Sequence, residues 1–506
     1  MRKAYLFIAA VGFFLSSSLI FAQGTPDPCT SGHEFATTDC ALTWHGITLY
    51  GAYDVGIGWV SHGLPENGYN YEGASLVNRN GFQHRFLVAP NNLQQTGLGI
   101  RGKEEFLPGW SVVFNASTGI NPQSGLLANA SKTDIINNGL PRSSYSYAID
   151  GARAGQPFND EIYGGISSTH FGTLTFGRQR SLGTDAMVLY DPAGGSYAFS
   201  YIGYNGTIAG GGDTENSRWD DAVKYRLTVG PVHFGAMYKF ADGSAGCYSA
   251  SATWTATTCT AESAHNNAYG FDLGAGFGKF SVDIVPQHYN QAISVLNPLL
   301  GPQSPTQSYQ STTNSINTNP ITGGVNLVDP NDTVYGIATD NYAVMVAAKY
   351  AWDRFKLFAG YEYVWQNNPK NPLGVGASDQ GGYNMSGVED DNLDNEKLLN
   401  IWWTGAKYAA DKKTDITFAW YQQRQNDFRS PPTCSPSAGF RSSCAGTLNE
   451  GSLYADHHFT KRFDGFAGIA YSYVKGGLAI AIPHGPGVPY KSNNNFAPTV
   501  GGRFVF

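Results

Sequence analysis

The last eleven residues of the chain, Phe496 to Phe506, read FAPTVGGRFVF. Successive side chains of an extended strand point to opposite faces. One face would carry Phe496, Val500, Gly502, Phe504 and Phe506, and the other Thr499, Gly501, Arg503 and Val505. A strand of about ten residues with an apolar face is long enough to cross a bilayer at a tilt. We therefore predict that this stretch faces lipid and closes a ring of strands.

The same alternation begins the folded part of the chain, where residues 47–59 read ITLYGAYDVGIGW. It recurs along the sequence and predicts seventeen strands. Their expected ranges are 44–60, 82–89, 95–105, 110–119, 159–168, 170–179, 218–229, 232–240, 268–277, 279–290, 341–352, 355–367, 398–410, 415–428, 451–461, 463–475 and 496–506. Pro90 and Asn91–Asn92 interrupt ladder donation, so the second and third segments form one bent strand. The result is sixteen, and an even number is typical of bacterial barrels.

The connections between these strands alternate between short and long. Short turns such as Gly230–Pro231 and Asp353–Arg354 alternate with long polar stretches such as 120–158, 180–217 and 291–340. Outer-membrane barrels have this asymmetry, with short periplasmic turns and long outer loops. The predicted fold class is thus all-β, a 16-stranded antiparallel transmembrane β-barrel.

The N-terminal segment predicts export. Arg2 and Lys3 precede an apolar run that ends at the small residue Ala22, which is the pattern of a secretory signal. The alternative is an anchoring helix. No other apolar run reaches the roughly 18 residues of a spanning helix, so an exported chain would enter a membrane as a closed barrel. The expected organisation is a signal peptide over 1–22, a short extension over 23–43 and a barrel over 44–506.

Composition agrees with a barrel that performs no nucleic-acid or cofactor chemistry. Charged residues make up 14% of the chain, well below the roughly 25% of soluble domains. Aromatic residues also make up 14%, and there are 62 glycines. The net charge of −7 argues against nucleic acid as a partner. No phosphate loop, nucleotide fingerprint or metal motif is present, so no cofactor is predicted.

Six cysteines form three close pairs. The pairs are Cys29 with Cys40, Cys247 with Cys259, and Cys434 with Cys444. Although six cysteines allow fifteen pairings, short loops in an oxidising compartment favour the local one, which predicts three disulfides. A metal site is the competing interpretation, but no pair has C-x₂-C spacing or histidines at zinc spacing.

Several stretches resemble the Gram-negative general porins of β-proteobacterial type. The most specific is the hairpin that joins Tyr163-Gly-Gly-Ile-Ser167 to Phe171-Gly-Thr-Leu-Thr-Phe-Gly-Arg-Gln179. Residues 97–105 (GLGIRGKEE) and 502–506 (GRFVF) are also similar. The resemblance implies a homotrimeric outer-membrane channel whose third outer loop, residues 180–217, folds into the lumen. The acids that this loop would supply are Asp185, Asp191, Asp213 and Glu215.

Strand parity predicts which charges face the lumen. The basic cluster consists of Arg85, Arg101, Lys103, Lys224 and Arg226, and the inward acids include Asp54, Asp272 and Asp283. A basic wall opposite an acidic loop, with Asp185 and Asp191, would make a transverse field at the narrowing and a weak preference for anions. Alternatively, these charges only wet the wall. Asp160 and Glu161 stand where the family often has arginine, and Arg178 points inward only if its strand twists or bulges at its end.

The resulting hypothesis is a passive diffusion pore for ions and small hydrophilic solutes, embedded in outer-membrane lipid. A substrate-selective channel or a surface adhesin is the alternative, because the long loops could bind a ligand. A barrel hydrolase is disfavoured, since no G-x-S-x-G or H-E-x-x-H motif is present.

Overall fold

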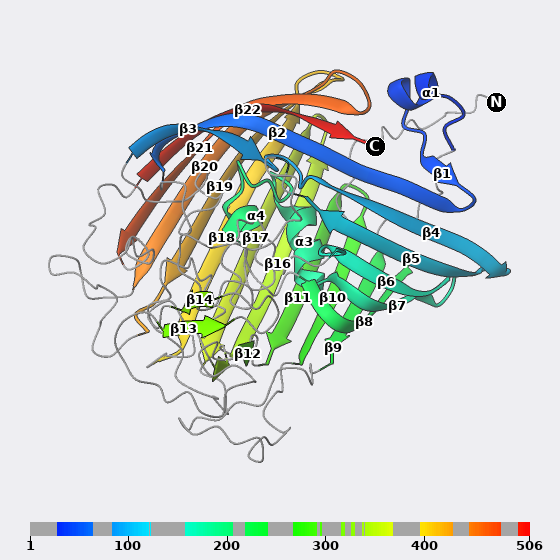
Figure 1. The fold of residues 1–506 in the computed structure, drawn as a ribbon, viewed down its shortest axis with the longest axis horizontal. Helices are drawn as coiled ribbons and strands as arrows, with labels where there is room; N and C mark the ends of the chain where they lie inside the picture. Colours follow the sequence, from blue (N-terminus) through cyan, green and yellow to red (C-terminus); the bar gives the residue numbers. More distant parts are fainter. Residues whose placement is uncertain are drawn as a thin grey trace, which may run out of the picture.

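The computed structural model describes residues 28–63, 83–120, 122, 157–205, 218–240, 267–290, 294–295, 315–318, 325–328, 336–337, 340–367, 395–428, 445–476 and 494–506. Most of these residues lie in one closed antiparallel sheet, which forms a tilted barrel (Figure 1). The predicted signal peptide lies outside the described residues.

The barrel strands follow one another in chain order around the wall. They are β2 (Ile47–Gly63), β3 (Gln83–Pro90), β4 (Gly97–Leu107), β5 (Trp110–Gly119), β6 (Glu161–Ser168), β7 (Gly172–Arg180), β8 (Arg218–Val229), β9 (Val232–Lys239), β10 (Ala268–Phe277), β11 (Phe280–Tyr289), β16 (Asp340–Trp352), β17 (Phe355–Asn367), β18 (Lys397–Ala409), β19 (Thr414–Gln425), β20 (Gly446–His458), β21 (Phe463–Gly476) and β22 (Asn494–Val505). β22 pairs with β2, as predicted, and closes the ring.

The interrupted second strand is confirmed. β3 pairs with residues 55–63 of β2, and β4 pairs with residues 47–52 of the same edge, so the two segments occupy one strand position. Between them the chain turns inward over Asp54, whose carboxylate accepts hydrogen bonds from the backbone N–H groups of Asn92, Leu93 and Gln94. Counting β3 and β4 together, the barrel has 16 strands.

Side chains alternate between lipid and lumen along these strands. In β10, Tyr269, Phe271 and Leu273 are exposed on the outer face, whereas Asp272 is 2% exposed on the inner face. The same period-two pattern in β2 exposes Leu49, Tyr53 and Ile57. An apolar exterior with a polar interior is what a lipid-embedded, water-filled barrel requires.

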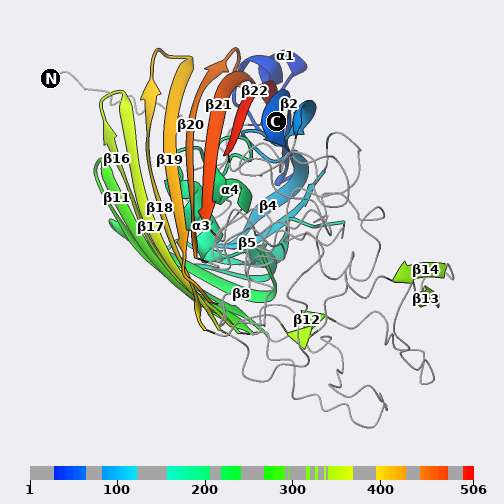
Figure 2. The same ribbon diagram turned by 90° about the vertical axis from the view of Figure 1, so that its left-hand side faces the viewer.

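Short turns gather at one end of the barrel, here called the turn end, and the opposite ends of the strands form the loop end (Figures 1 and 2). The connection after β11 contains four short strands, which make two small two-stranded pairings, β12 with β15 and β13 with β14. They are β12 (Ser294–Val295), β13 (Ser315–Thr318), β14 (Val325–Val328) and β15 (Gly336–Ile337).

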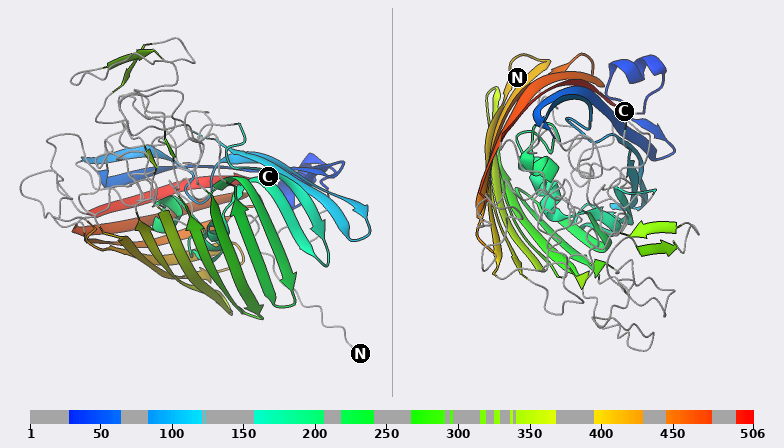
Figure 3. Two further views of the ribbon diagram at one scale, coloured as in Figure 1. Left: turned by 90° about the horizontal axis from the view of Figure 1, so that it is seen from below. Right: turned by 60° about the vertical axis from the view of Figure 1, so that its left-hand side comes forward.

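The third loop folds into the lumen, as the family resemblance implied. It contains α3 (Leu182–Tyr190) and α4 (Tyr201–Asn205), which lie inside the ring of strands (Figure 3, right). Apolar loop residues, including Tyr190 and Phe199, are fully buried there with the wall residue Trp403. The loop therefore packs as part of the interior rather than projecting into solvent.

A small N-terminal lobe sits at the turn end. It holds α1 (Gly32–Thr37) and β1 (Leu42–Trp44), and the first predicted disulfide joins Cys29 to Cys40. The guanidinium of Arg462 holds the lobe against the barrel. It donates one hydrogen bond of 2.6 Å to the carbonyl oxygen of Phe35 and another to the carbonyl oxygen of Cys40. None of the helices described is long and apolar enough to span a membrane.

The other two predicted disulfides cannot be compared with the structure in the same way. Cys247 and Cys259 fall in the connection between β9 and β10, and Cys434 and Cys444 fall in the connection between β19 and β20. All four cysteines lie outside the described residues, so the pairing of Cys247 with Cys259 and of Cys434 with Cys444 stays a prediction.

Candidate pore constriction

Helix α3 begins where β7 leaves the wall. The Ser181 hydroxyl accepts a hydrogen bond from the N–H of Thr184 at 3.1 Å and caps the helix. Leu182, Ala186 and Met187 are buried against the wall. The helix packs beside β9, β10, β11, β16 and β17. Its first turn is thus held close to the inner face of β8, where two of the predicted basic residues lie.

Asp185 joins the loop to this basic wall by direct contact. Its Oδ2 lies 2.6 Å from Nζ of Lys224 and 2.5 Å from the guanidinium of Arg226. Arg226 reaches further and meets Asp272 at 3.0 Å. Burial alone would raise the pKa of Asp185, but the two cations outweigh burial and hold that pKa below its usual value. These charges therefore form a compact ion-pair network, with no gap between loop and wall at this point.

Asp191, the second acid predicted for the loop, faces a different part of the wall. Its Oδ1 accepts the hydroxyl of Tyr421 at 2.6 Å, and its carboxylate also accepts the N–H groups of Ala193 and Gly195 at 3.1 and 2.7 Å. Gly195 has a φ of +79°, which an L side chain rarely adopts. Asp191 is 2% exposed. It shapes the turn after α3 and ties that turn to β19.

After Gly195, the loop contacts strand β20 on one side of the lumen and the break between β3 and β4 on another. The ring of Phe199 stacks on Tyr454, with centroids 4.5 Å apart, and its carbonyl accepts the hydroxyl of Ser452 at 2.7 Å. Ser196 donates to the carbonyl of Asn92 in the β3–β4 break. The loop thus crosses the lumen and is fixed at several points.

A charged cluster that the sequence interpretation missed holds both ends of the loop. Asp160 lies 2.7 Å from Arg218 and 3.2 Å from Arg180, the residues at which the loop returns to and leaves the sheet. Glu161 accepts the backbone N–H of Arg180 at 3.1 Å. The sequence did contain a sign of this cluster, because two adjacent acids, Asp160 and Glu161, precede two arginines that flank a long loop. Parity could not reveal it, because the contacts cross three strands.

The other predicted residues are placed as follows. Arg101 is half-buried over the ring of Tyr50, 5.0 Å from its centroid, and Lys103 is exposed toward the lumen. The side chain of Arg85, and all of Asp213 and Glu215, lie outside what the structure describes. The ladder between β7 and β8 shifts its register between Gly177 and Gln179, beside Arg178, which is buried and bonded to Asp220.

Beneath α3, toward the turn end, lies a cavity of about 410 Å³. Hydroxyl groups of β5–β8 line one side of it, and Lys103, Arg226 and His233 contribute charge or polarity. Asp185 belongs both to this lining and to the ion-pair network. A polar space bounded by a fixed loop is the arrangement expected at the narrow part of a channel.

A lipid-facing barrel with a loop fixed across a polar lumen defines an outer-membrane channel protein. Residues 8–477 match the model of the Gram-negative porins, and the chain belongs to that family. An outer membrane porin protein of Bordetella pertussis is 24% identical over 196 residues, which cover 38% of this chain and 42% of the relative. The match therefore spans less than half of that relative. Membership places the chain in the outer membrane.

Solved structures show the same fold at low sequence identity. The anion-selective porin from Comamonas acidovorans has a TM-score of 0.53 and 15% identity, covering 91% of this chain and 99% of that one. A loop-deletion mutant of the Vibrio cholerae outer membrane protein OmpT has a TM-score of 0.50 and 12% identity, with 91% and 99% coverage.

Proposed function

We propose that the chain forms a water-filled channel for the passive diffusion of ions and small hydrophilic solutes. The observation that carries this proposal is the third loop, which crosses the lumen and is fixed at both walls beside a polar cavity. Such a loop reduces the open cross-section of the lumen. The mechanism is then size exclusion at the loop, with wall charges modulating passage.

The charges at the constriction support a weak preference for anions. One carboxylate, Asp185, serves two cations, Lys224 and Arg226. In the part of the chain that the structure describes, Arg101 and Lys103 have no acidic partner. The Comamonas neighbour is described as anion-selective. Because it is only 15% identical, the anion preference proposed for this chain is argued from Lys224, Arg226, Arg101 and Lys103 themselves. Asp272 and Asp283 oppose it and keep it weak.

Bilayer recording tests the function and its selectivity together. We expect the purified, refolded protein to give discrete conductance steps, and a KCl gradient to give a small reversal potential of anion-selective sign. Absence of steps from protein that is folded would reject the channel. A cation-selective sign would reject only the anion preference.

The same barrel is proposed to assemble as a homotrimer and to hydrolyse nothing. Both expectations come from the porin family. Cross-linking in detergent should stop at three subunits, and closure under voltage should occur in three equal steps. Assays with ester and peptide substrates should give no turnover above that of heat-unfolded protein.

A further inference from the structure

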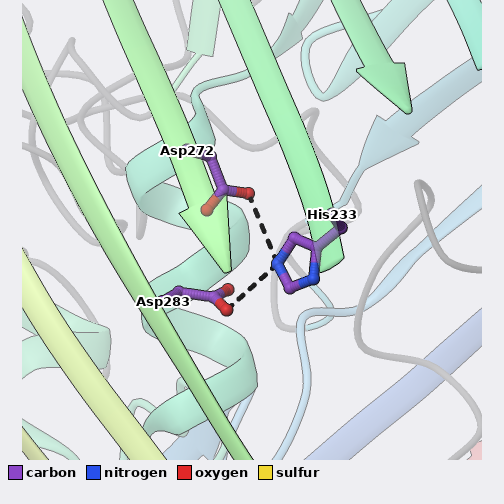
Figure 4. A group of neighbouring side chains, drawn as sticks. All are labelled: His233, Asp272 and Asp283. Carbon is purple, nitrogen blue, oxygen red and sulfur yellow. Dashed lines mark ion pairs between the residues drawn. The ribbon is translucent and has the colours of Figure 1, made fainter. Parts of the chain in front are cut away.

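We propose that His233, Asp272 and Asp283 form a lumen-facing binding site for a divalent transition metal of the Zn²⁺ type. The three side chains come from adjacent strands β9, β10 and β11 and point toward one another (Figure 4). Nε2 of His233 lies 3.0 Å from Oδ1 of Asp283 and 4.0 Å from Oδ2 of Asp272. All three donor atoms lie within 4.8 Å of one another.

The backbone provides the space in which these donors meet. Gly274 is the register partner of His233 on one side and of Asp283 on the other. A β-carbon at this position would lie 2.0 Å from Oδ1 of Asp283 and 2.2 Å from Nε2 of His233. The two donor atoms therefore converge over a residue without a side chain. A glycine in the middle of a strand weakens that strand. Its presence here is accounted for if the close approach of the His233 and Asp283 donor atoms has a function, such as holding a metal ion.

The donor set selects the kind of ion. One imidazole and two carboxylates, at roughly 2.0–2.2 Å from the metal, are ligands typical of Zn²⁺, with further positions left for water. Calcium needs six to eight oxygens, and magnesium keeps most of its waters. Because the three residues also line the 410 Å³ cavity, a hydrated ion in the lumen can reach them.

Neighbouring groups support the site and also oppose it. Tyr190 donates its hydroxyl to Oδ1 of Asp283 at 2.8 Å, which is the outer contact that orients a ligating carboxylate. It also connects the site to α3. Arg226 competes for Asp272, because one of its amino groups lies 3.0 Å from Oδ2 of Asp272. The other amino group lies 2.5 Å from Asp185, so Arg226 keeps a carboxylate partner outside the proposed site. Oδ1 of Asp272 is buried, with no hydrogen-bond partner among the described residues.

A second cluster of similar composition is less suited to a metal. Asp456, His458 and Asp464 also lie within 4.8 Å of one another. Arg503, however, contacts both carboxylates, at 3.5 and 2.5 Å, and so occupies the space between them. This cluster serves as an internal comparison in the test.

The test measures metal binding on the folded barrel, independently of conductance. Co²⁺, which replaces Zn²⁺ in such sites and absorbs visible light, is titrated into detergent-solubilised protein, and Zn²⁺ is then used to displace it. We expect saturable binding that His233→Gln weakens at least about tenfold, the smallest loss seen when even an outer partner is removed. Gly274→Ala should have a similar effect, since it keeps all three ligands and fills the space between them.

Two variants serve as controls. His170→Gln removes an exposed histidine from a turn at the same end of the barrel, and His458→Gln alters the second cluster. Both should bind Co²⁺ as the parent does. Unchanged affinity in His233→Gln, or loss of binding in His458→Gln alone, would overturn the proposal. Faster migration before heating on detergent gels confirms that each variant is folded.

Discussion

The hydroxyl of Tyr421 lies 2.6 Å from Oδ1 of Asp191, although 230 positions separate the two residues. This contact holds the turn after α3 against the wall opposite the basic strands. Tyr421→Phe should destabilise the protein by about 1–3 kcal/mol, because a buried acceptor loses one partner. Urea unfolding followed by tryptophan fluorescence measures the loss. Tyr350→Phe, on the lipid-facing side, should be neutral.

Asp185→Asn should make the channel more selective for anions. The change leaves Lys224 and Arg226 without the carboxylate that both contact. Breaking a buried ion pair from one side costs about 3–5 kcal/mol, so lower stability should accompany the change. The reversal potential in a salt gradient should move in the anion-selective direction. Asp353→Asn removes the same charge from an exposed turn, and an equal shift there would contradict the assignment.

The Asp185 contact should also resist acid. Because the neighbouring cations lower its pKa in the folded protein, the stability it contributes is present above its usual value of 3.8. That stability is lost as pH falls through the lower, folded pKa. The part of the conductance that depends on Asp185 should therefore stay constant from neutral pH down to its usual pKa of 3.8 and change only below it. Asp185→Asn should abolish that low-pH step, and a step that persists would point to another group.

Asp160→Asn should loosen both ends of the loop. Arg180 and Arg218 would lose the carboxylate that they share. We expect greater open-channel current noise at unchanged trimer yield, because the barrel ladder itself is untouched. Single-channel recording measures the noise. Asp220→Asn provides the control, since Asp220 is 58% exposed and pairs with Arg178. If Asp220→Asn also increased the current noise, the effect could not be assigned to the contacts of Asp160 with Arg180 and Arg218.

The N-terminal lobe should depend on its disulfide and the barrel should not. Replacing Cys29 and Cys40 by serine removes a constraint of about 3 kcal/mol on a short loop. Limited proteolysis with mass spectrometry should then show cleavage within residues 28–44. Arg462→Gln should give the same cleavage with the disulfide intact, because Arg462 holds the carbonyls of Phe35 and Cys40. Protection in both variants would show that other contacts hold the lobe.

Strand positions were predictable because the period of two is local. The ranges 110–119, 218–229, 268–277 and 355–367 coincide with strands of the structure. The prediction was less accurate at β20, which begins at Gly446 rather than near residue 451. The residues Gly446–Gly451 lack a clear apolar alternation, so pairing with β19 and β21 extends the strand where its own pattern does not.

The constriction was only partly predictable, because its contacts are not local. Parity placed Lys224 and Arg226 on the inner face, and the family resemblance placed Asp185 in the loop. Neither indicated that these charges would touch. Asp54 likewise had the expected direction, but its role in holding the β3–β4 break depends on backbone N–H groups 38 to 40 positions away.

The loop's contacts have a consequence for the order of assembly. Phe199 and Ser196 reach strands that are translated long before and long after them, since Ser452 lies 253 positions away and Asn92 lies 104. Contacts of such sequence separation carry a large loop-closure cost and slow folding. The loop can therefore make its full set of contacts only after β20 has joined the sheet. A correctly packed third loop therefore indicates that the β3–β4 break and β20 have both reached their final positions.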